Sequence, residues 1–101
     1  MRLQLQNLWN YFGREYEYPV KFYYANAINT YCGFIGNISF LIDLRDQDLK
    51  NSIETEISID SVNWISGPTF LSIPELEKFL HLLILNYDNE TEVREIFRSK
   101  E

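Results

Sequence analysis

The chain has 101 residues, of which 46% are hydrophobic, and it carries a net charge of -6 with a pI near 4.7. A chain of this size buries roughly 60–70% of its unfolded surface, which predicts one domain over residues 1–101. The acidic balance disfavours a general nucleic-acid binder, because phosphate binding needs clustered Lys and Arg. The lone Cys32 excludes an internal disulfide framework, and polar residues interrupt the apolar ones near Met1, so we expect a soluble cytoplasmic protein.

The first predicted element is a helix over about residues 2–12. Its apolar residues follow the i, i+3, i+4, i+7 spacing of one helix face, and Gly13 stands where the helix would end. Residues 3–6 also alternate like a short strand, so that alternative stays open. The apolar face consists of Leu5, Leu8, Trp9 and Phe12.

From Val20 the apolar period changes to two, which predicts strands. A first strand spans residues 20–28, with a turn at Asn29-Thr30. Extended structure resumes over 31–35. Gly36-Asn37 then fits a tight hairpin turn, although Gly33 and Gly36 could instead bend one long strand as bulges.

Residues 38–44 alternate as a further strand, and a polar connector over 45–51 leads to the most regular alternation in the chain. Residues 53–60 place apolar side chains and a threonine on one face. The other face carries Glu54, Glu56, Ser58 and Asp60. This pattern predicts a strand with one core face and one carboxylate face.

An apolar stretch after Asp60 includes Val62, Trp64 and Ile65. We expect Gly67-Pro68 to interrupt it before a last short strand at residues 69–71.

The clearest local signal is a capping box, in which Ser72 begins a helix and Glu75 stands three residues later, with Pro74 tolerated in the first turn. The helix is predicted over about residues 73–87. Leu82 and Leu85 widen its apolar stripe, which suggests burial on more than one side. A short helix follows over 90–101. The main stripe is Ile73, Leu76, Phe79, Leu80, Leu83, Ile84 and Tyr87, and the short helix turns Val93, Ile96 and Phe97 inward.

These elements together predict an α+β fold. It consists of an N-terminal helix, an antiparallel β-meander of about four strands, and a C-terminal helix packed across one face of the sheet.

Residues with chemical potential give little support for catalysis. His81 lies within a helix dominated by packing, and Cys32 has no cationic neighbour in the sequence to lower its pKa. Asp43, Asp46 and Asp48 lack the glycine and distal glutamate of a calcium loop. We therefore expect no enzyme, no cofactor and no metal.

Acidity is concentrated in one segment. Between Asp43 and Asp60, six carboxylates face only two cations, Arg45 and Lys50, which makes the segment net -4. Residues 1–40 carry three cations and two carboxylates. Such a segment is suited to a basic protein partner, with aromatic side chains as anchors. The predicted partner-binding residues are Asp43, Asp46, Asp48, Glu54, Glu56 and Asp60, with Tyr23 and Trp64.

In size and charge the chain resembles the immunity proteins that bacteria keep against nuclease toxins, including those of contact-dependent growth inhibition. Glu54, Glu56 and Asp60 most suggest this resemblance. It implies a monomer or homodimer that binds a basic toxin and occludes its active site, without touching nucleic acid or membrane.

Small phage inhibitors of nucleases, such as anti-CRISPR proteins, look similar for the same reason. In element order alone, the chain resembles the single-stranded-DNA-binding coactivator and Whirly folds. That second resemblance implies a sheet-based module that binds nucleic acid or peptide as a dimer.

Overall fold

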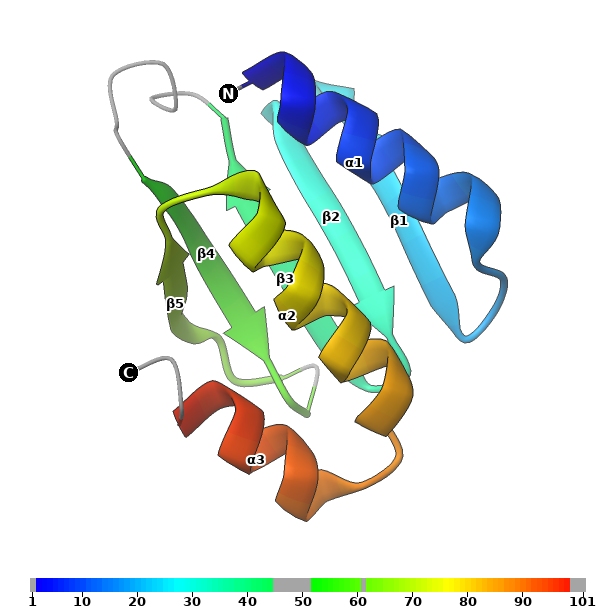
Figure 1. Ribbon diagram of the computed structural model, residues 1–101, viewed down its shortest axis with the longest axis vertical. Coiled ribbons are helices and arrows are strands. Elements are labelled where there is room, and N and C mark those ends of the chain that lie inside the picture. Colours follow the sequence, from blue (N-terminus) through cyan, green and yellow to red (C-terminus); the bar gives the residue numbers. More distant parts are fainter. Residues whose placement is uncertain (1, 45–51, 61, 99–101) are drawn as a thin grey trace.

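A computed structural model describes residues 2–44, 52–60 and 62–98 (Figure 1). The chain forms a five-stranded antiparallel sheet in which each strand lies beside its neighbour in sequence. The α1 and α2 helices cross one face of this sheet, and α3 packs against α2 (Figure 1). In chain order the elements are α1 Arg2–Glu15, β1 Val20–Ala25, η1 Asn26–Ile28, β2 Thr30–Ile35, β3 Ile38–Asp43, β4 Ile53–Ser58, β5 Ile65–Phe70, α2 Ile73–Asn86 and α3 Glu90–Arg98.

The predicted α+β class is confirmed, with five strands in the meander. The predicted interruption at Gly67-Pro68 is wrong, because β5 runs through both residues and is longer than the short strand expected at 69–71. Proline lacks an N–H, so it fits a strand that has a neighbour on one side only, and β5 is at the sheet edge. A bulge between Glu54 and Glu56 accommodates it, and the Thr55 hydroxyl donates to the Pro68 carbonyl at 2.7 Å.

The α1 helix continues past Gly13 to Glu15, so the predicted end at residue 12 is wrong, as is the alternative strand at residues 3–6. Gly13 has a packing role instead. A Cβ atom there would lie 3.0 Å from the Phe22 carbonyl oxygen. The glycine therefore allows α1 to approach β1 closely, which outweighs its poor helix propensity.

The loop between β2 and β3 is a two-residue hairpin, which resolves the alternative left open by the sequence. Ile35 pairs with Ile38 across Gly36-Asn37, and Gly36 has a φ of 63°. The first strand is shorter than predicted. A 3-10 turn replaces its last residues, and Asn29 adopts a left-handed φ of 48°, leaving Ile28 exposed.

One core cluster lies between the sheet and the helices. From α1, Trp9 contacts the β1 ring of Phe22 at 5.1 Å between centroids. From α2, Phe79 contacts Phe70 of β5 at 5.0 Å and Phe97 of α3 at 5.5 Å. These aromatic contacts join all three helices to the same face of the sheet.

The predicted Ser72 cap begins α2, whereas the Glu75 carboxylate bonds the residue before the cap instead of Ser72 itself. The Glu75 N–H donates to the Ser72 hydroxyl at 3.3 Å, and the Glu75 carboxylate accepts from the Leu71 N–H at 3.2 Å. The expected widening of the buried stripe is wrong, since Leu82 is 39% and Leu85 76% exposed. The described part of the short third helix matches the prediction, with Val93 and Phe97 buried.

Among the residues that the structure describes, no helix is both long and apolar enough to cross a membrane.

Candidate functional site

We call the sheet face opposite α1 and α2 the open face, because Figure 1 shows both helices on the other side. Register and alternation decide which side chains it carries. Phe22 of β1 and Phe40 of β3 are buried on the helix-covered face. Their neighbours in sequence, Tyr23 and Leu41, therefore belong to the open face, in one cross-strand row with Cys32.

Tyr23 and three of the predicted partner-binding carboxylates share this face. Glu56 pairs directly with Leu41, and Glu54 follows the same alternation along β4. Asp43 stands two residues after Leu41 on β3, which sets it at the level of Glu54. All three carboxylates are exposed, and Tyr23 is 39% exposed. The fold thus joins residues that are more than thirty positions apart in sequence.

Aromatic rings occupy the β1–β2 side of the open face. The rings of Tyr23 and Phe34 stack with centroids 6.0 Å apart and planes 20° from parallel. The Lys21 ammonium nitrogen lies 5.3 Å from the Tyr23 centroid. We did not single out Phe34 from the sequence, although the Gly36-Asn37 hairpin register sets it opposite Ser39, on the face of Leu41. The open face therefore combines an aromatic half with an acidic half.

Asp60 has a structural role that the charge pattern did not reveal. Its Oδ1 accepts from the backbone N–H groups of Val62 and Asn63, both at 2.9 Å, and from the Ser58 hydroxyl at 3.1 Å. Its Oδ2 accepts from the Asn63 side-chain amide at 2.9 Å. These hydrogen bonds, led by the Asn63 backbone N–H, hold the pKa of the Asp60 carboxyl well below its usual range. The carboxylate is thus engaged in organising the β4–β5 loop.

The loop organised by Asp60 presents apolar side chains to solvent. Val62 is 75%, Trp64 44% and Ile65 58% exposed. Ile65 pairs with Ile57, and extending this register by one residue sets Trp64 opposite Ser58, on the open face. Trp64 is therefore available as an anchor beside the acidic half, while Asp46 and Asp48 lie outside the described residues.

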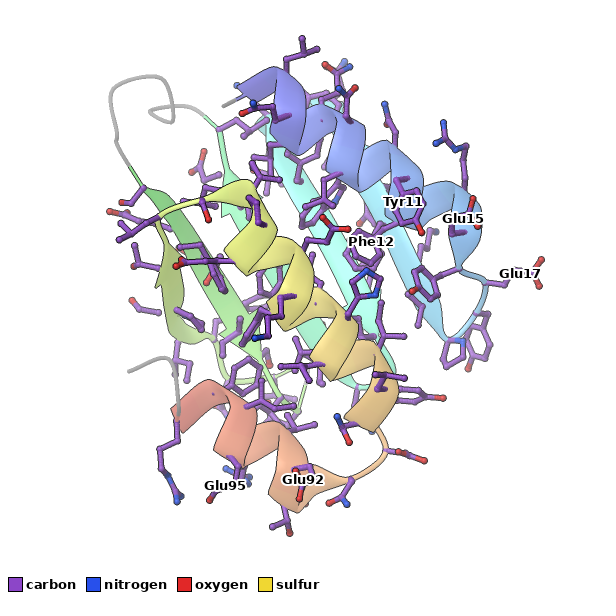
Figure 2. All side chains as sticks on the ribbon, in the orientation of Figure 1. Tyr11, Phe12, Glu15, Glu17, Glu92 and Glu95 are labelled. Atoms are coloured by element: carbon purple, nitrogen blue, oxygen red, sulfur yellow. The ribbon has the colours of Figure 1, made fainter. Side chains whose placement is uncertain are left out.

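His81 and Cys32 both have packing environments. The His81 ring lies 5.1 Å from Phe12, which Figure 2 shows between α1 and α2, and its Nδ1 is 3.3 Å from the Tyr16 hydroxyl. Its Nε2 is 3.8 Å from a Glu77 carboxylate oxygen on the same helix. Burial raises the pKa of the Cys32 thiol, which leaves it a poor nucleophile. No group of three potential metal ligands occurs among the described residues.

Comparisons with protein-family models, with curated proteins and with solved structures give no match to this chain.

Proposed function

We propose that this protein binds a basic protein partner through its open face, and that it acts as an inhibitor or immunity protein that occludes the active site of a toxin, most simply a nuclease. The observation that carries the proposal is the meeting of Tyr23, Asp43, Glu54 and Glu56 on one sheet face that neither α1 nor α2 covers.

The two halves of the open face suit different parts of such an interaction. Neighbouring strands lie about 4.8 Å apart, so the row from Tyr23 to Glu56 spans roughly 14 Å across three strand spacings. A nuclease active site holds phosphate with Lys, Arg and His, and carboxylates at fixed positions on a sheet can occupy those cations. The carboxylates speed encounter, while Tyr23, Phe34 and Trp64 supply apolar anchor area that slows release.

The charge of the open face favours a protein over a nucleic acid. Asp43, Glu54 and Glu56 would repel phosphates, and Lys21 is the one cation that the described part of this face presents. A stacked pair of rings could hold bases, but without clustered cations it lacks the electrostatic attraction on which nucleic-acid affinity depends.

Both edges of the sheet are poorly suited to adding another strand, which also favours the open face. At the β1 edge, the Val20 N–H donates to the Glu17 carbonyl at 2.9 Å, and α1 covers the Phe22 carbonyl at Gly13. At the β5 edge, Pro68 and the bulge break the ladder. A partner therefore gains more from the side chains of the face than from an exposed backbone.

Affinity capture with a matched pair of charge-reversal variants tests this proposal. Three proteins are immobilised and exposed to lysate of the native host: the wild type, the Glu54→Lys/Glu56→Lys variant, and a control Glu92→Lys/Glu95→Lys variant. Figure 2 shows the control residues on α3, where both are exposed. We expect a basic protein at stoichiometric yield with wild type and control, and its loss with the open-face variant.

The recovered protein should also lose its enzymatic activity when the wild-type chain is added. Equal recovery by all three immobilised proteins would contradict the proposal, and recovery of nucleic acid instead would favour the sheet-based binding module.

A further inference from the structure

A groove of about 410 Å³ lies between β5 and α3, the two elements at the lower left of Figure 1. Its walls combine apolar and polar groups in nearly equal share, with Ile59 and Ile65 on the apolar side and Ser66, Thr69 and two arginines on the polar side. The volume falls in the range of roughly 300–1,000 Å³ that is typical of small-molecule sites. Phe97 belongs to the core cluster on the helix side of the sheet, so the groove extends from that side to the β5 edge, where Ser66 and Thr69 pair with Glu56 and Glu54.

Among the described residues, the two charged ones that line the groove are both cations, in a chain whose net charge is -6. Arg94 and Arg98 are one helical turn apart on α3 and so project to the same side. Each pairs at 2.7 Å with a glutamate of its own helix, Glu90 and Glu95 respectively. All four side chains are exposed, so these pairs are weak and the guanidinium groups can turn to another carboxylate with little loss.

We propose that this groove binds a small organic carboxylate with an apolar chain, of the size of a medium-chain fatty acid. The guanidinium groups of Arg94 and Arg98 would hold the carboxylate, for which their planar donor geometry is suited. The chain would lie against Ile65, which is 58% exposed, and the partly buried Ile59, and would exclude water from them. An extended peptide is less suited, because Pro68 and the bulge deprive β5 of regular backbone pairing.

Titration of the isotope-labelled full chain with sodium decanoate, followed by NMR, tests this site directly. We expect saturable shifts confined to the amides of β5 and α3. Two comparison ligands separate the contributions: acetate keeps the carboxylate without the chain, and decyltrimethylammonium keeps the chain with the opposite charge. Each should bind at least about 10-fold more weakly than decanoate, because each lacks one of the two contributions.

The matched variants are Arg94→Gln/Arg98→Gln and the control Arg14→Gln, which alters an arginine on α1, beside the opposite edge of the sheet. The double variant should lose decanoate affinity by at least about 10-fold, and the control should keep it. Circular dichroism verifies that each variant folds.

Three results would overturn the site: no saturable shift with millimolar decanoate, shifts located on the open face, or equal binding of the cationic detergent. None of these outcomes bears on the proposed protein partner, which is tested by variants of β4.

Discussion

The two faces of the sheet use the same strands for different purposes. On β3 and β4, Phe40 and Ile57 pair on the helix-covered face and are buried, while the next pair along, Leu41 and Glu56, lies on the open face. A strand turns successive side chains to opposite sides, so stabilising and binding residues alternate along it. Substitutions on one face should therefore leave the role of the other largely intact.

The largest expected effect is on the covered face. Leu80 of α2 is completely buried, so Leu80→Ala should lower the free energy of unfolding by about 2–5 kcal/mol through lost burial and a residual cavity. Leu85→Ala on the same helix removes the same atoms from a side chain that is 76% exposed. It should change the free energy of unfolding by less than about 0.5 kcal/mol. Urea denaturation of both variants measures the contrast. Equal losses would mean that α2 presents a different face to the sheet.

Much of the covered face could be predicted from the sequence, because it depends on apolar periodicity and on local capping. The spacing that includes Leu80 identified the helix, and Ser72 with Glu75 set its start. The errors arise where a tertiary contact overrides a local rule. Gly13 continues its helix because α1 packs on β1, and Pro68 stays in a strand because that strand is at the edge.

The open face could be predicted only in part. The alternation around Glu54 and Glu56 identified their shared side, but their nearness to Tyr23 depends on a strand order that no local pattern contains. The role of Asp60 was missed for a similar reason. A charge count treats every carboxylate alike, whereas its hydrogen bonds to the backbone of Val62 and Asn63 appear only once the loop is folded.

A smaller effect is expected at the β4–β5 loop, where Asp60 joins structural and binding roles. Asp60→Asn removes the charge and sets an amide donor against the Asn63 amide, so stability at neutral pH should fall. The lowered pKa means that the wild-type carboxylate stabilises the fold fully above its unfolded pKa of about 3.9, and that this stabilisation is lost as the pH falls further. The difference between wild type and variant should therefore narrow below about pH 4, as measured by denaturation across pH. If the stability difference between wild type and variant did not change with pH, the loss would come from altered shape at this position and not from the missing charge.

The smallest effect on folding is expected from Glu54→Lys/Glu56→Lys, the variant with the largest expected effect on binding. Both residues are exposed on the open face, and the reversal changes the net charge from -6 to -2 because each substitution adds two positive charges. Its free energy of unfolding should stay within about 0.5 kcal/mol of wild type, as for most surface substitutions. Association of the wild-type chain with a captured partner should slow as salt rises above about 0.1 M, because exposed charges more than about 10 Å apart are then screened. A large loss of stability would show that Glu54 and Glu56 stabilise the sheet itself. Binding and stabilising residues would then not be divided between the two faces of β4, the strand with the most regular alternation.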